Sequence, residues 1–134
     1  MSTFLEEAKR LRGTTERHYN CAQAVLVPFA KSLGIDEELA MNLSVHFGGG
    51  MKMGSVCGAV TGGLMALGLM GVDQAADANA FCREIRNRHE GCLDCRDLLR
   101  MNMERGGEKK PHCDAMVYES VLLVEELCRK RGVL

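Results

Sequence analysis

The chain has 134 residues, of which 46% are hydrophobic, and 17 Lys and Arg side chains face 18 Asp and Glu for a formal net charge of −1. This length supports one domain with its own hydrophobic core, and we expect residues 1–134 to form a single domain. The balanced charge and an aromatic content of only 4%, without Trp, exclude the usual nucleic-acid surfaces, so no nucleic-acid partner is expected.

The first twelve residues indicate a cytoplasmic protein. They carry five charged side chains and lack the apolar centre of a signal peptide. The cytoplasm keeps thiols reduced. The chain has seven cysteines, an odd number, so at least one cannot pair within the chain. These observations disfavour a disulfide-stapled scaffold and favour metal binding, catalysis or redox sensing.

The first half of the chain predicts three helices. Apolar residues at helical spacing over 5–13 predict an amphipathic first helix. Asn20 is a typical N-cap for the second, with Gln23 at the capping-box position. Asp36 is placed to cap the third.

A glycine-rich apolar helix is expected at the centre, beginning at Ser55 and ending at Gly71. Residues 55–72 carry no charge, and about 18 apolar residues is the length at which a membrane span becomes a candidate. Several glycines interrupt this stretch, and Lys52 and Asp73 flank it closely. We therefore expect a buried core helix and no membrane insertion. A homodimer packed through this helix is a candidate assembly.

Three further helices are predicted in the second half. Asp73 is placed to cap the fifth helix, Asp94 the sixth and Asp114 the last, with a polar loop over residues 102–111 before it. No alternating strand pattern of convincing length is present. The sequence thus predicts an all-α fold, a compact bundle of about six to seven helices around the central glycine-rich helix.

Four of the seven cysteines lie beside these predicted helix caps. They are Cys21, Cys57, Cys95 and Cys113. A sulfur in the first turn of a helix lies at the positive end of the helix dipole, which favours thiolate over thiol. Thiolate is the form that attacks disulfides and binds metal. By contrast, Cys82 and Cys128 fall on apolar helix faces, where a small buried hydrophobe is expected.

Cys57 is the strongest single candidate because glycines surround it. Glycine inside a helix costs about 1 kcal/mol relative to alanine. Such a cost is tolerable where helices pack closely or where a ligand approaches bare backbone. Gly54, Gly58 and Gly62 are therefore candidate cofactor contacts.

Four segments of the chain resemble one known family. They are Asn20-Cys21-Ala22-Gln23-Ala24-Val25-Leu26, Phe47-Gly48-Gly49-Gly50, Gly54-x-x-Cys57-Gly58-Ala59-x-x-Gly62 and Cys95-Arg96-x-Leu98-Leu99. They resemble the C_GCAxxG_C_C family, small bacterial and archaeal proteins described as redox-active, and a related domain occurs in split-Soret cytochromes c. The resemblance implies that the family's four characteristic cysteines correspond to Cys21, Cys57, Cys95 and Cys113. Cys82, Cys92 and Cys128 lie outside that pattern.

Three hypotheses follow. The four cysteines ligate an iron–sulfur cluster or another thiophilic metal; or they exchange disulfides, with Cys57 as the attacking thiol of low pKa; or the chain is a non-catalytic helical adaptor. Under the first two hypotheses, all four cysteines are site residues and a redox partner is expected.

Overall fold

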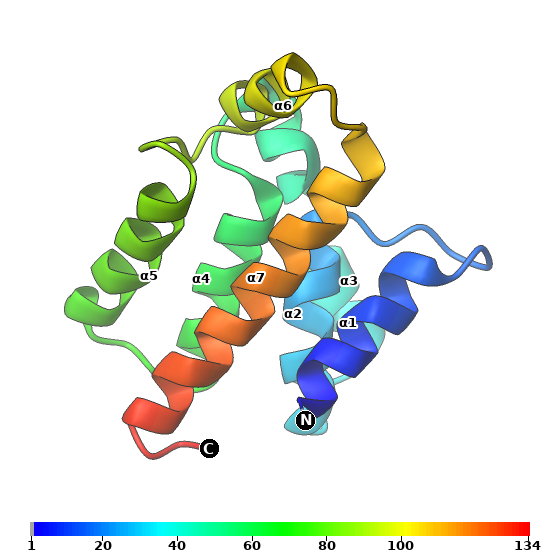
Figure 1. Ribbon diagram of the computed structural model, residues 1–134. Helices are drawn as coiled ribbons and strands as arrows, with labels where there is room; N and C mark the ends of the chain where they lie inside the picture. The colour runs from blue at the N-terminus through cyan, green and yellow to red at the C-terminus, as the bar shows by residue number, and fades with distance from the viewer. Residues whose placement is uncertain (1) are drawn as a thin grey trace.

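The computed structural model describes residues 2–134, and its fold is all-α (Figure 1). The helices are α1 (Thr3–Gly13), α2 (Cys21–Ser32), α3 (Glu37–Ser44), α4 (Gly58–Leu69), α5 (Ala75–Arg88), α6 (Cys95–Glu104) and α7 (Lys109–Lys130), with two short helical turns, η1 (Val45–Phe47) and η2 (Gly50–Gly54), between α3 and α4. Within residues 2–134 no β-strand forms, and one isolated antiparallel bridge pairs Val56 with Asp94. The predicted all-α bundle is confirmed.

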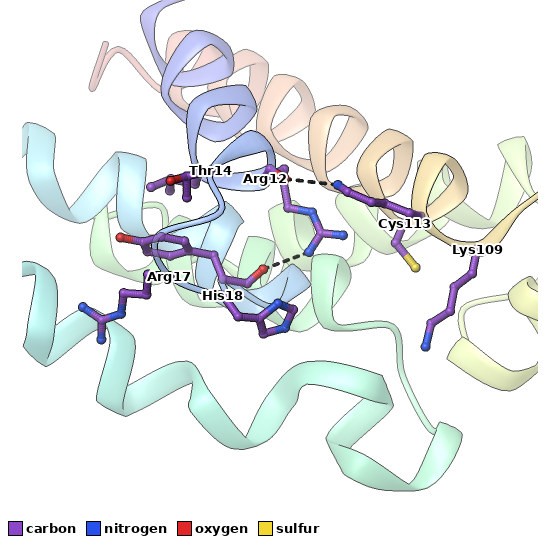
Figure 2. A pocket seen from close by; sticks show the side chains of 9 residues that line it. Arg12, Thr14, Arg17, His18, Lys109 and Cys113 are labelled. Atoms are coloured by element: carbon purple, nitrogen blue, oxygen red, sulfur yellow. Dashed lines mark hydrogen bonds between the residues drawn. The ribbon is translucent and has the colours of Figure 1, made fainter.

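The end of α1 lies against the beginning of α7 (Figure 2). Arg12 extends from α1 and its guanidinium contacts the Asp114 carboxylate at 2.7 Å. The same side chain donates a hydrogen bond to the carbonyl of Tyr19 at 2.9 Å, and Lys110 donates one to the carbonyl of Arg12 at 3.1 Å. These bonds join α1, the loop that follows it and the first two turns of α7.

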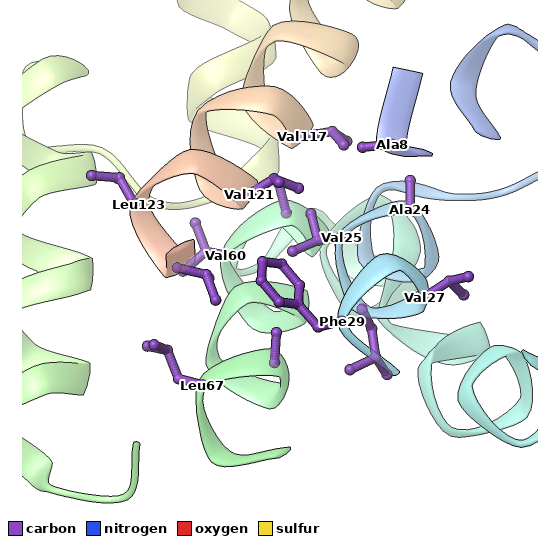
Figure 3. Packing of buried hydrophobic residues seen from close by; sticks show 14 of the residues in the cluster. Ala8, Ala24, Val25, Val27, Phe29, Val60, Leu67, Val117, Val121 and Leu123 are labelled. Atoms are coloured by element: carbon purple, nitrogen blue, oxygen red, sulfur yellow. The ribbon is translucent and has the colours of Figure 1, made fainter. Parts of the chain in front are cut away.

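The hydrophobic core lies where α2, α4 and α7 meet (Figure 3). Val25 and Phe29 of α2, Val60 of α4, and Val117 and Val121 of α7 have no exposed surface. Full burial of side chains of this size contributes about 1.5–3 kcal/mol each. The expectation that the glycine-rich helix is central is confirmed, because α4 packs against α2, α5 and α7.

Glycines bring α4 unusually close to its neighbours. A Cβ on Gly62 would lie 2.7 Å from the Ala22 carbonyl oxygen of α2, and one on Gly63 would lie 2.3 Å from the Phe81 ring of α5. No side chain fits at these distances, so the conformational cost of glycine is offset by close packing. The N-terminal ends of α2 and α4 are thereby held together.

Some predicted helix boundaries are wrong. α4 begins at Gly58, with Cys57 as its N-cap residue, rather than at Ser55. The chain before it is extended, and the backbone N–H of Cys57 donates a hydrogen bond to the carbonyl of Leu93, outside the helix. α5 follows Gln74 rather than Asp73. α7 begins at Lys109, with Pro111 inside its first turn, where the missing N–H of a proline would have no helical partner anyway.

The apolar stretch over residues 55–72 forms a short buried helix. α4 has 12 residues, and none of the helices in the described part of the chain has the length and apolar character needed to cross a membrane.

Candidate functional site

The four predicted site cysteines line one cavity. Its volume is about 380 Å³, and Cys21, Cys57, Cys95 and Cys113 all border it. Three of them lie at helix starts: Cys21 is the first residue of α2, Cys57 the N-cap of α4 and Cys95 the first residue of α6. Cys113 lies in the second turn of α7, since that helix begins four residues earlier. The prediction that Cys113 is at a helix start is therefore wrong, although the cysteine still borders the cavity.

The beginning of α2 is held by its cap. Asn20 accepts a hydrogen bond from the backbone N–H of Gln23, and the Gln23 side chain accepts one from the N–H of Asn20, both at 2.9 Å. The predicted capping box is confirmed. The Asn20 amide also donates to the carbonyl of Val45 at 3.1 Å. A Cβ on Gly58 would lie 3.4 Å from the Cβ of Cys21, which shows how closely α4 approaches this cysteine.

Backbone hydrogen bonds join Cys57 to Cys95. The N–H of Cys57 donates to the Leu93 carbonyl at 2.8 Å, and the N–H of Cys95 donates to the Ser55 carbonyl at 2.6 Å. This small antiparallel bridge places two cysteines that are far apart in sequence on neighbouring segments. Gly50, at φ +64, leaves room for Cys95, because a Cβ on Gly50 would lie 2.9 Å from that of Cys95.

The cavity wall is cationic because Arg12, Arg96 and Lys109 border it. His18 and His112 also line it, and among the described residues no carboxylate side chain does. The N-terminal ends of α2, α4 and α6 reach the same space and add their partial positive charge. Such a wall favours anionic groups, including thiolates.

Cys113 is the cysteine that this environment favours as a thiolate. A hydrogen bond from Cys21 lowers the pKa of Cys113 to about 7, and Arg12 and Lys109 act in the same direction against the opposing effect of burial. The same hydrogen bond, together with burial, raises the pKa of Cys21. Of this pair, Cys113 is therefore the thiol that is favoured as a thiolate.

Cys57 behaves in the opposite way. Burial raises the pKa of Cys57 to about 11, although the backbone N–H groups of Ala59 and Val60 counteract it. Burial also raises the pKa of Cys95, and the negative charge of Cys113 adds to that effect. The predicted low pKa of Cys57 is wrong, because desolvation outweighs the helix N-terminus at this position.

The remaining predicted residues divide between the cavity and the core. Gly54 and Gly58 border the cavity, whereas Gly62 packs against Ala22 away from it. Cys82, Cys92 and Cys128 do not border it. Cys128 has no exposed surface, as expected for a buried hydrophobe, and Cys82 is half-buried.

Sequence reasoning missed the basic residues of the cavity. Arg12 lies on a helix that looked like an ordinary amphipathic element, and Lys109 lay in a predicted loop. The available signal was the position of two histidines, since His18 lies three residues before Cys21 and His112 directly precedes Cys113.

Within residues 2–134, no three His, Cys, Asp or Glu side chains are grouped closely enough to hold a metal ion.

Comparison with known proteins agrees with the sequence pattern. A family model described as "Putative redox-active protein (C_GCAxxG_C_C)" matches residues 19–127, which include all four cavity cysteines. No curated protein matches the chain, and no solved structure does. Since the family model covers most of the chain, this protein belongs to the C_GCAxxG_C_C family.

Proposed function

We propose that the protein carries out thiol–disulfide exchange, with Cys113 as the attacking thiolate and Cys21 as the resolving thiol. The observation that carries this proposal is that Cys21 and Cys113 border one cavity together with Arg12 and Lys109, where the pKa of Cys113 is lowered and that of Cys21 is raised. The charge of Cys113 also raises the pKa of Cys57 and Cys95, and all four cysteines border the same cavity.

The reaction uses two thiols and one disulfide substrate. The Cys113 thiolate attacks one sulfur of the substrate, forms a mixed disulfide and releases the other half as a thiolate, which takes a proton. The Cys21 thiol then loses its proton and attacks Cys113 Sγ, releasing the second half of the substrate. Two electrons pass from the protein to the substrate. A dithiol reductant, which is the redox partner that we propose in the cytoplasm, returns the Cys21–Cys113 disulfide to two thiols.

A second candidate function is binding of an iron–sulfur cluster or another thiophilic metal by Cys21, Cys57, Cys95 and Cys113. Four thiolates are the donor set that such clusters prefer, and the cationic wall favours an anionic group. The donor types fit a cluster, whereas no three candidate ligands among the described residues are grouped closely enough for a single metal ion. This favours the thiol proposal over a mononuclear site.

Trapping with bis(2-hydroxyethyl) disulfide tests the first proposal. In the Cys21→Ser variant, we expect a stable mixed disulfide at Cys113, identified by peptide mass spectrometry. Cys113→Ser should abolish adduct formation at the cavity, and the matched control Cys82→Ser should react like the unmodified chain. A first adduct at Cys57 or Cys95 would overturn the assignment.

Anaerobic reconstitution with iron and sulfide separates the two candidates. Under the thiol proposal, the purified protein stays colourless and retains less than one iron per chain. Stoichiometric iron and sulfide, lost in the Cys57→Ser variant, would favour the second candidate instead.

A further inference from the structure

A second cavity, whose lining residues Figure 2 draws, shares Arg12, His18, Lys109 and Cys113 with the first. Its volume is about 360 Å³, within the range of sites for small molecules. It lies between the end of α1, the loop that follows and the first two turns of α7. Of the four cavity cysteines, only Cys113 borders both spaces. A molecule in the second cavity would therefore meet Cys113 and none of the other three cysteines.

The second cavity is strongly basic. Arg12, Arg17, His18, Lys109 and Lys110 border it, and no carboxylate side chain does so among the described residues. The whole chain has a net charge of −1, so this concentration of positive charge is local and does not follow from composition.

Two of these basic groups are free to bind a ligand. Asp114 pairs with Arg12 and Lys110, and Glu38 pairs with Arg17. In the described part of the chain, neither Lys109 nor His18 has an ion-pair or side-chain hydrogen-bond partner. In Figure 2 the Lys109 side chain and the sulfur of Cys113 extend to the same side of α7, facing the imidazole of His18.

We propose that this second cavity binds the anionic part of a small, carboxylate-bearing disulfide and presents its sulfur to Cys113. The proposal rests on the thiol–disulfide function above and names its substrate class. An anionic substrate would otherwise be repelled by the attacking thiolate, and a cationic pocket compensates for that repulsion.

The reaction with such a substrate is the exchange already described. Attack by Cys113 forms one S–S bond to the substrate and breaks its internal S–S bond, and the leaving half departs as a thiolate. Lys109 and His18 are positioning residues in this step, since they contact the carboxylates rather than the reacting sulfurs.

A series of three disulfides tests the proposal on the full chain in the Cys21→Ser background. The probes are oxidised glutathione, which is anionic, bis(2-hydroxyethyl) disulfide, which is neutral, and cystamine, which is cationic. The readout is the second-order rate of mixed-disulfide formation at Cys113, followed by intact mass. We expect the anionic probe to react roughly tenfold faster than the neutral one, and the cationic probe to be slowest.

The ratio of the anionic rate to the neutral rate is the informative quantity. Lys109→Gln also alters the thiolate fraction of Cys113, but that change affects both probes equally and cancels in the ratio. We expect this ratio to fall from roughly 10 to a value between about 1 and 3 in Lys109→Gln, and to decrease in His18→Asn. The control Lys130→Gln, at the far end of α7, should leave it unchanged.

Two kinds of failure are distinguishable. If the neutral probe does not react at Cys113, the thiol–disulfide function itself fails, and this proposal with it. If all three probes react at Cys113 with equal rates, or if Lys109→Gln keeps the full ratio, the exchange function stands and the anion pocket is overturned.

Discussion

Cys113 and Cys57 both lie near the N-terminal end of a helix, yet the pKa values of their thiols shift in opposite directions. The neighbouring Cys21 thiol, Arg12 and Lys109 all lower the pKa of Cys113 and so stabilise its thiolate. Cys57 is 6% exposed, and desolvation dominates there. Local partners and burial, more than the helix dipole, thus decide which of these sulfurs is reactive.

The pH dependence of alkylation follows from this difference. With a pKa of about 7, Cys113 should be half thiolate near neutral pH, and its rate of reaction with iodoacetamide should rise through pH 7 and level off above it. Cys57, with a pKa of about 11, should remain slow throughout that range. Peptide mapping after timed alkylation gives both profiles; a faster reaction at Cys57 at pH 7 would contradict the assignment.

Removal of the Cys21 thiol should slow the alkylation of Cys113. In Cys21→Ala the hydrogen bond is lost, the pKa of Cys113 rises towards its ordinary value, and the alkylation rate at pH 7 falls by roughly tenfold per unit of pKa. Cys21→Ser keeps an O–H donor, so the alkylation rate of Cys113 should fall less in this variant. Equal rates in the two variants would show that the hydrogen bond does not set the reactivity of Cys113.

The helices are held at the cavity by two kinds of contact. α2 and α4 approach through glycines, with Gly62 against Ala22, whereas α1 and α7 are joined by the pair of Arg12 and Asp114. Both kinds of contact determine where the cysteines lie. Substitutions at either contact should therefore change the free energy of unfolding and the arrangement of the cysteines.

Gly62 and Gly68 form a matched pair within α4. A Cβ on Gly62 would lie 2.7 Å from a backbone oxygen, whereas a Cβ on Gly68 would meet nothing within 4 Å. Gly62→Ala should lower the free energy of unfolding by about 1–3 kcal/mol through overpacking. Gly68→Ala should raise it by up to about 1 kcal/mol through helix propensity. Urea unfolding of both variants is the measurement, and a stabilising Gly62→Ala would contradict close packing of α2 on α4.

Arg12 and Arg10 give a second matched comparison on α1. The Arg12 side chain is 10% exposed and pairs with Asp114, whereas the Arg10 side chain is 56% exposed and pairs with Glu7. Arg12→Gln should lower the free energy of unfolding by about 1–3 kcal/mol, and Arg10→Gln by less than about 0.5 kcal/mol. Thermal or urea unfolding measures both changes. Equal changes in the free energy of unfolding would mean that the pair of Arg12 and Asp114 does not stabilise the packing of α1 on α7.

At the scale of the whole molecule, the chain gathers four cysteines from four helices into one cavity. Their identity was predictable, because Asn20 and the glycines around Cys57 carry local signals. Their grouping was not, since it depends on the bridge between residues 55–57 and 93–95 and on the packing of α7. The basic pocket beside Cys113 was also hidden, because Arg12, His18 and Lys109 come together only in the folded chain.

Disulfide mapping of the oxidised protein is the decisive experiment. The fully reduced, metal-free chain is treated with one equivalent of a neutral disulfide, its remaining thiols are alkylated in acid, and its peptides are sequenced by mass spectrometry. We expect a bond between Cys21 and Cys113 as the main product, with Cys57 and Cys95 alkylated. A main bond between Cys57 and Cys95, or an oxidised chain without an internal disulfide, would contradict the assignment of Cys21 and Cys113 as the redox pair.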